Sequence, residues 1–160
     1  MTKPNFHHRA FRASDLDRVE LLDDEKQLIY DHADFLEGLA QVKAERTFCG
    51  IGFIGDQPLF IGGYYEVAPG VCQVFIIPDK GIYERPLLFI LKVRHWLRQV
   101  ERKTWCHRIQ TFSLPLKRID EWMVALGFLY EGTLNRYTES GQDYKLWSRV
   151  KIDGVWRCAA

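Results

Sequence analysis

The sequence has almost no net charge and no long apolar run. Its 160 residues carry 22 basic and 21 acidic side chains, which leaves a net charge of +1. The overall charge therefore gives no reason to expect binding to nucleic acid or to an anionic membrane. No stretch approaches the length of a membrane-spanning helix, about eighteen apolar residues, and the polar first thirty residues lack a signal-peptide core. We expect a soluble cytoplasmic protein with no membrane partner.

Cysteine is scarce, and the cysteines are not clustered. The four residues lie far apart and include no C-x-x-C pair: Cys49, Cys72, Cys106 and Cys158. Zinc sites and disulfide frameworks have closer or more regular spacings, so we expect neither. His7 and His8 would point to opposite faces of a strand, so this pair does not predict a metal site. We expect no bound metal, a reducing compartment and a frayed tail over residues 158–160.

The chain length fits one compact domain, which we expect over residues 1–160 with its core between 7 and 151. The N-terminal third predicts a strand and two helices. HHRAFR, residues 7–12, alternates as a strand does, and Ser14 then offers a helix N-cap with Asp15 and Asp17 in the first turn. Apolar residues recur at helical spacing over 19–29 and again over 31–44.

The middle of the chain predicts three strands and a long helix. The β-rich runs 46–56 and 57–68 meet at Gly55-Asp56-Gln57-Pro58, which is typical of a hairpin turn. A turn at 68–70 leads into VCQVFIIP, residues 71–78, which is apolar enough to be a central strand buried on both faces. The stretch 85–103 has a wide apolar face and Pro86 suits its first turn, so it predicts a helix.

The last third predicts a strand, a short helix and a closing hairpin. HRIQTFSL, residues 107–114, is strand-like, and residues 117–128 form an amphipathic pattern that closes near Gly127. Residues 129–151 predict two strands that turn at Ser140-Gly141. The predicted order is β-α-α-β-β-β-α-β-α-β-β.

This order, together with WMVALGFLYEG at residues 122–132, resembles the fold of the GNAT superfamily of N-acetyltransferases. The most characteristic part is Leu126-Gly127-Phe128 followed by Glu131-Gly132. The phrases WLRQVER, WMVALGF and RYTESGQDYKLWSRV look most like the acetyltransferase-like and internal virion proteins of tailed bacteriophages. The resemblance implies an α+β fold in which helices flank a central, mixed but mostly antiparallel sheet.

In that superfamily the strand before the long helix parts from its neighbour, and acyl-CoA lies in the gap with its pyrophosphate on a glycine-rich turn. Placed on residues 71–100, the resemblance implies acetyl-CoA as the cofactor. It assigns the acyl group and pantetheine to the backbone of Phe75, Ile76 and Ile77. It assigns the pyrophosphate to Lys80, Gly81, Ile82 and Arg85.

The turn departs from the glycine-rich pattern. Gly81 is its only small residue, and Pro86 lacks an N–H donor. Asp79 would bring negative charge toward a phosphate, whereas Lys80 and Arg85 could neutralise it. Two interpretations stay open, a divergent phosphate site and a simple bend between a strand and a helix.

Acetyl transfer needs a base that takes a proton from the amine and often an acid for the leaving thiolate. Glu66, near the end of a predicted strand, is the candidate base, and Tyr83 is a candidate acid or substrate contact. Each has a simpler interpretation, a solvated carboxylate at a strand end and a half-buried ring. Met123 stands where the superfamily commonly has a proton-donating Tyr, and Leu116 falls where an Asn is frequent.

Two functions follow from the resemblance. One is an acyl-CoA-dependent N-acyltransferase that acetylates an amine of a protein or small molecule. The alternative is a catalytically inactive GNAT-fold structural or interaction protein of a bacteriophage, in the virion or the host cytoplasm, that contacts phage or host proteins. Five tryptophans leave room for an aromatic docking surface. The basic residues near the end of the long helix complement its dipole, so no nucleic-acid partner is expected.

Overall fold

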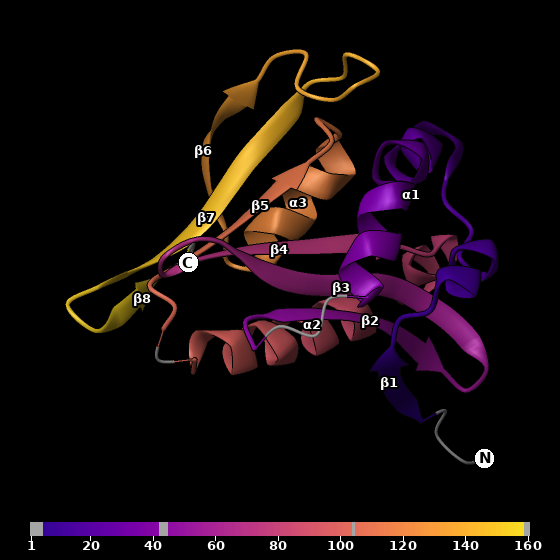
Figure 1. Ribbon diagram of the computed structural model, residues 1–160, viewed down its shortest axis with the longest axis horizontal. Coiled ribbons are helices and arrows are strands. Elements are labelled where there is room, and N and C mark those ends of the chain that lie inside the picture. Colours follow the sequence, from indigo (N-terminus) through magenta and orange to yellow (C-terminus); the bar gives the residue numbers. More distant parts are fainter. Residues whose placement is uncertain (1–4, 42–44, 104, 159–160) are drawn as a thin grey trace. The chain divides into compact units, whose positions relative to one another are not determined.

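The computed structural model describes residues 5–41, 45–103 and 105–158 (Figure 1). These ranges contain three α-helices: α1 Lys26–Gln41, α2 Pro86–Glu101 and α3 Lys117–Ala125. They contain three short 3-10 helices: η1 Ala13–Arg18, η2 Asp23–Glu25 and η3 Lys80–Glu84. They contain eight strands: β1 Phe6–Ala10, β2 Thr47–Ile54, β3 Gln57–Ala68, β4 Val71–Pro78, β5 Arg108–Ser113, β6 Leu129–Leu134, β7 Tyr144–Ile152 and β8 Val155–Arg157.

The strands form one sheet in the order β1-β2-β3-β4-β5-β7-β6, and β8 pairs with β7. β4 and β5 run parallel, and the other ladders whose register is described are antiparallel. The predicted α+β class and the mixed, mostly antiparallel sheet flanked by helices are confirmed. Among the described residues, no helix is both long enough and apolar enough to cross a membrane.

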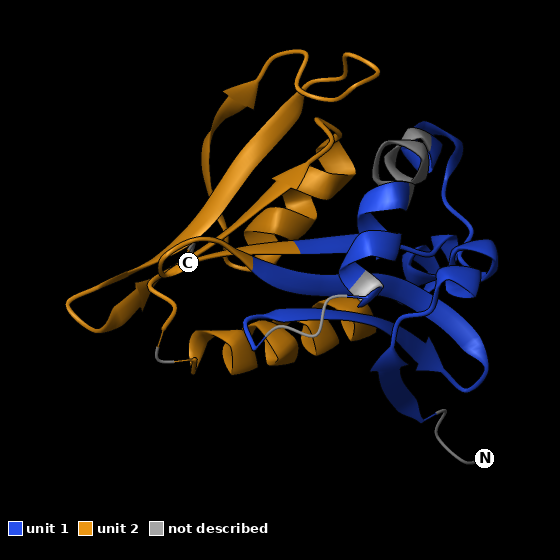
Figure 2. Ribbon diagram, in the orientation of Figure 1, with its two compact units in different colours: residues 1–65, 75–86 blue, residues 66–74, 87–160 orange. Residues whose placement is uncertain are grey.

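The chain divides into two compact units (Figure 2). Unit 1 contains residues 1–65 and 75–86, and unit 2 contains residues 66–74 and 87–160. The division passes through β3 and β4, each of which contributes residues to both units. The single domain expected from the chain length stays a prediction.

In unit 1, α1 packs on β2 through one apolar face (Figure 1). Leu36 and Leu39 are buried, as are the alternate residues Cys49, Ile51 and Phe53 of β2. Residues three or four apart share a helix face, and residues two apart share a sheet face. These two periodicities therefore place all five side chains in one core.

The prediction of a helix that begins at Ser14 is wrong. η1 and η2 are short 3-10 segments, and the backbone is extended where it leaves η1 at Val19 and where it enters η2 at Leu22. Val19 and Leu21 are buried while Glu20 between them is exposed, which is the alternation of an extended chain. The second predicted helix, over 31–44, is found as α1, which begins earlier than predicted. Residues 42–44 of that prediction lie outside the described residues.

In unit 2, α2 and α3 pack against one face of the sheet. Lys145, Trp147 and Arg149 alternate along β7 and share that face. Lys145 Nζ lies 2.5 Å from Asp120 Oδ2 of α3, and an Arg149 guanidinium nitrogen lies 2.5 Å from Glu101 Oε1 of α2. The two ion pairs therefore hold both helices to the same side of β7.

The chain forms an eighth strand, β8, which ends at Arg157, and Cys158 directly after it is exposed. The frayed tail expected from residue 158 stays a prediction. β8 pairs with β7, and Trp156 Nε1 donates to the carbonyl oxygen of Glu101 over 3.3 Å. Arg149 donates to Cys158 Sγ over 3.3 Å. Residues 159–160 lie outside the described residues.

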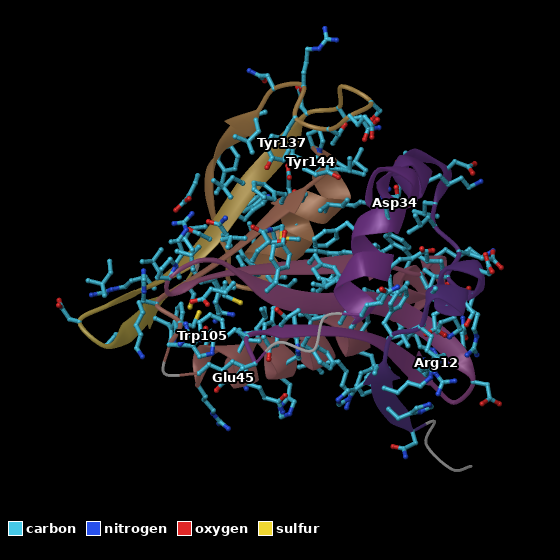
Figure 3. All side chains as sticks on the ribbon, in the orientation of Figure 1. Arg12, Asp34, Glu45, Trp105, Tyr137 and Tyr144 are labelled. Carbon is cyan, nitrogen blue, oxygen red and sulfur yellow. The ribbon has the colours of Figure 1, made fainter. Side chains whose placement is uncertain are left out.

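The closing hairpin of β6 and β7 is confirmed, with Ser140-Gly141 inside a longer loop. Tyr137 and Tyr144 lie beside one another at its loop end, with ring centroids 6.0 Å apart (Figure 3). Phe112 of β5 packs 5.2 Å from the Tyr137 ring.

All five tryptophans are buried or half-buried, so a docking surface of exposed tryptophan side chains is not found.

Candidate functional site

The candidate site begins where β4 stops pairing with β5. Their parallel register runs from Val71–Arg108 to Gln73–Gln110, three residue pairs in all. Both strands continue past that last pair, β5 alongside β7. The segment assigned to the acyl group, Phe75–Ile77, therefore lies beyond the described ladder of β4 with β5.

A chain of side-chain hydrogen bonds in unit 2 ends at the last residue pair of this ladder. Gln110 Nε2 donates to Gln73 Oε1 over 3.1 Å, and Arg108 Nε donates to Gln110 Oε1 over 2.8 Å. The other two Arg108 nitrogens donate to the Glu131 carboxylate over 3.0 and 2.5 Å. Ser148 Oγ donates to the same carboxylate over 2.6 Å. The side chains of four strands are thus connected on one face of the sheet.

Glu131 reaches this chain because the ladder of β6 with β7 is irregular between Tyr130 and Gly132. A bulge of this kind redirects a side chain. Hydrogen bonds from Arg108 outweigh the effect of burial and hold the pKa of Glu131 below its usual range, with a further contribution from Ser148. The Glu-Gly pair that carried the family resemblance therefore supplies the carboxylate that anchors Arg108.

The turn between β4 and α2 is closed by Asp79. Asp79 is 5% exposed, and its Oδ1 accepts the backbone N–H of Gly81 over 2.8 Å. Its Oδ2 accepts the backbone N–H of Glu20 over 2.8 Å. Its carbonyl oxygen accepts the N–H of Ile82 over 3.1 Å. The N–H groups of Gly81 and Ile82, two of the residues assigned to pyrophosphate, are therefore already bonded within the protein.

Lys80 is bound to Glu20 by both its backbone and its side chain. The Lys80 N–H donates to the Glu20 carbonyl oxygen over 2.6 Å, and the Lys80 ammonium forms an ion pair with the Glu20 carboxylate. The hydrogen bond to Glu20 raises the pKa of Lys80. Arg85, the second predicted cation, is exposed, and its N–H donates to the carbonyl oxygen of Ile82 over 3.0 Å.

Tyr83 is joined to a buried carboxylate. Its hydroxyl donates to Glu25 Oε1 over 2.5 Å, and Glu25 is 1% exposed. Since the phenolic proton points to Glu25, this contact connects η2 to η3 within unit 1. The assignment of Tyr83 as an acid or substrate contact stays a prediction.

Glu66 closes the turn between β3 and β4. Its Oε1 accepts the backbone N–H of Gly70 over 3.0 Å, and its side chain is half-buried. Glu66 belongs to unit 2, whereas the other predicted site residues belong to unit 1. Its assignment as the base stays a prediction.

The three residues assigned to the acyl group differ in burial. Ile77 is buried in the core of unit 1, and Phe75 and Ile76 are half-buried. The Phe75 ring lies 6.0 Å from Phe35 and 6.5 Å from Tyr65. Their backbone, not their side chains, is what the resemblance assigns to the cofactor.

Sequence reasoning did not predict the hydrogen bonds that carboxylates form at this turn. An Asp followed two residues later by Gly is a signal for a local cap, so the role of Asp79 was within reach. Glu20 lies 59 positions from Asp79, and Glu25 lies 58 positions from Tyr83. No local pattern indicates contacts over such separations.

The described residues contain no group of three or more metal-ligating side chains that could hold a metal ion. All four cysteines are free thiols. Cys72 and Cys106 are both buried and share a hydrogen bond, which raises the pKa of Cys72 and lowers that of Cys106.

Comparison with solved structures identifies the fold. No protein-family model matches the chain, and no curated protein matches its sequence. A spermidine N-acetyltransferase chimera with Vibrio cholerae sequence is similar in structure, with a TM-score of 0.68 and 15% identity over 89% of this chain and 93% of that one. A ribosomal L7/L12 alpha-N-protein acetyltransferase in complex with coenzyme A has a TM-score of 0.64 and 12% identity over 97% of both chains. An aminoglycoside acetyltransferase in complex with coenzyme A has a TM-score of 0.64 and 16% identity over 92% and 95%. The chain has the fold of the GNAT acetyltransferases.

Proposed function

We propose that this protein is an acyl-CoA-dependent N-acyltransferase that transfers an acetyl group from acetyl-CoA to an amine. The observation that carries the proposal is the short parallel ladder of β4 with β5, in a chain whose fold is shared with acetyltransferases in complex with coenzyme A. The amine belongs to a protein or a small molecule, since the structural neighbours include a ribosomal-protein acetyltransferase and a spermidine acetyltransferase.

The turn residues fit the phosphates of the cofactor only in part. Lys80 and Arg85 are exposed cations at the two ends of this turn, and a pyrophosphate needs such charges. The N–H groups of Lys80 and Gly81 are bonded to Glu20 and Asp79. We therefore assign the phosphates to the two cationic side chains rather than to the backbone of this turn.

The backbone of Phe75–Ile77 is assigned to the acyl group and pantetheine. When bound, acetyl-CoA supplies the activated acetyl group. Glu66 is the proposed base that takes a proton from the amine, and its Oε1 accepts the backbone N–H of Gly70. The phenolic proton of Tyr83 is donated to Glu25. We therefore propose Tyr83 as a substrate contact rather than as the acid.

Thermal unfolding with saturating acetyl-CoA tests this function. A ligand that binds only the folded state stabilises it, by about 2.7 kcal/mol at a hundredfold excess over Kd. Lys80→Ala with Arg85→Ala should abolish the shift. Lys117→Ala with Arg157→Ala removes the same charge from exposed positions elsewhere and should leave the shift intact. No shift for the unmodified protein at millimolar acetyl-CoA would rule out the enzyme.

A second candidate is a GNAT-fold protein that no longer catalyses transfer. The observation that favours it is that the turn residues already have partners within the protein. Asp79 accepts the N–H of Gly81, and Glu20 forms an ion pair with Lys80. Met123, in place of the usual Tyr, agrees with it. A role in a bacteriophage virion stays a prediction within this candidate.

A further inference from the structure

We propose that Glu20 is an internal competitor for the cofactor phosphates at Lys80, so that acetyl-CoA must displace the Glu20 carboxylate to bind. This inference rests on the proposed function and concerns the regulation of the same site. It is carried by a set of contacts and a cavity that lie entirely within unit 1.

The backbone N–H and the backbone carbonyl of Glu20 are both hydrogen-bonded to the turn. Its N–H donates to Asp79 Oδ2 over 2.8 Å, and its carbonyl oxygen accepts the N–H of Lys80 over 2.6 Å. These two backbone bonds do not involve the Glu20 carboxylate. They place that carboxylate beside the Lys80 ammonium, with which it forms an ion pair.

A cavity of about 590 Å³ adjoins this ion pair. It is lined by Val19, Glu20, Leu21, Leu22, Asp23, Lys26 and Lys80. Each of its two lysines is paired with a carboxylate of the same wall, Lys80 with Glu20 and Lys26 with Asp23. The cavity gives a phosphate room to approach Lys80 from the side that Glu20 occupies.

The ion pair is of a kind that a phosphate can replace. The Lys80 and Glu20 side chains are 56% and 66% exposed, and exposed ion pairs are weak because water screens them. The cofactor pyrophosphate as a whole carries more negative charge than one carboxylate, and it has more acceptor oxygens. Only the Glu20 side chain has to move, since the backbone bonds to Asp79 and Lys80 remain. Glu20 should therefore lower the affinity for acetyl-CoA without abolishing binding.

Isothermal titration with acetyl-CoA tests the inference on the full chain. Glu20→Gln keeps the backbone contacts and removes the charge, and it should tighten Kd by about two- to fivefold. Glu121→Gln is the matched control, because it removes an exposed carboxylate that is paired with a lysine, Lys117, and that does not line this cavity. Glu121→Gln should leave Kd unchanged. In a Lys80→Gln background, Glu20→Gln should also have no effect.

The possible results separate the inference from the proposed function. Equal Kd values for the unmodified protein and Glu20→Gln would overturn the competition and leave the proposed function standing. Equal tightening by Glu20→Gln and Glu121→Gln would also overturn it, since the effect would then be one of net charge. Tighter binding of acetyl-CoA by Glu20→Gln than by the unmodified protein and the control variant would support it. No binding to any variant would overturn both.

Discussion

Gln110 donates a side-chain hydrogen bond to Gln73 over 3.1 Å across the last residue pair that joins β5 to β4. Gln73 is buried, and its own side-chain N–H donates over 3.4 Å to the carbonyl oxygen of Val74, the next residue along β4. A buried carbonyl that leaves a ladder needs another partner. The two glutamines therefore define the point at which the pairing of β4 with β5 ends.

Replacing Gln110 with Leu should destabilise the protein by about 1–3 kcal/mol. The reason is that Gln73 is 4% exposed and its amide oxygen would lose the donor it has now. Urea denaturation measures the loss. Gln99→Leu is the control, because Gln99 is exposed on α2 and the same change there should cost less than about 0.5 kcal/mol. Equal losses at the two positions would contradict the prediction.

Asp15→Asn should destabilise the protein by about 1–3 kcal/mol at neutral pH. Asp15 is 1% exposed and accepts two hydrogen bonds from the Arg9 guanidinium, over 2.7 and 2.6 Å. It also accepts the backbone N–H of Arg12 over 2.8 Å. Denaturation of the variant beside the unmodified protein measures the difference. Asp17→Asn, at an exposed position of the same 3-10 helix, should have little effect.

The destabilisation by Asp15→Asn should depend on pH. Burial opposes the charged form of Asp15, but hydrogen bonds from Arg9 and from the Arg12 N–H outweigh it and hold its pKa below the usual value. A depressed carboxyl pKa contributes stability that is complete above the unfolded-state value of about 4 and is lost as the pH falls through the folded-state pKa. The difference between the two proteins should be widest above about pH 5 and should narrow below about pH 4. A constant difference down to pH 2 would contradict this assignment.

Most of the fold was predictable because one local pattern decides each element. The helical spacing of Val93, Leu97 and Val100 predicts α2, and all three are buried in the structure. The N-terminal helix failed for the opposite reason. Ser14 and Asp15 match a helix-capping pattern, but Asp15 is bonded to Arg9 of the preceding strand, a contact that local patterns do not contain.

The candidate site was predictable in position but not in its contacts. The strand-turn-helix pattern located the turn at Lys80 and Gly81, and the structure has a strand, a 3-10 helix and α2 there. The carboxylate that pairs with Lys80 comes from Glu20, on a segment expected to be helical. An extended segment presents its backbone N–H and carbonyl to a neighbour, whereas a helix interior uses them itself. The error in secondary structure therefore concealed the partner of Lys80.

Arg149→Met should destabilise the protein by about 3–5 kcal/mol. The Arg149 side chain is 9% exposed and that of Glu101 is 13% exposed, so the change leaves a buried carboxylate without its cation. Arg149→Met combined with Glu101→Leu should recover much of the loss, because no unpaired charge is then buried. Denaturation of the two single variants and the double variant measures the coupling. A double variant no more stable than Arg149→Met would show that the ion pair is not the source.

Cys158 should be the only fast-reacting thiol of the folded protein. It is exposed, whereas the other three cysteines are buried. Burial raises the pKa of Cys49 to about 12, which leaves little thiolate at pH 8. Reaction with a disulfide reagent should therefore consume one equivalent quickly in the folded protein and four after denaturation. Cys158→Ser should remove the fast phase, and a second fast equivalent in that variant would contradict the burial of the others.

Gly70→Ala should destabilise the protein more than Gly154→Ala. The two glycines have nearly equal positive φ values, +79° and +78°, a conformation that costs an L-residue about 1–2 kcal/mol. A Cβ on Gly154 would meet nothing within 4 Å, whereas one on Gly70 would lie 2.1 Å from Nδ1 of His107. Gly154→Ala therefore measures the conformational cost alone, and Gly70→Ala should exceed it by at least about 1 kcal/mol in urea denaturation. In a His107→Ala background the clash is absent, so the cost of Gly70→Ala should fall to that of Gly154→Ala. Equal costs with His107 present would show that its ring does not pack on Gly70.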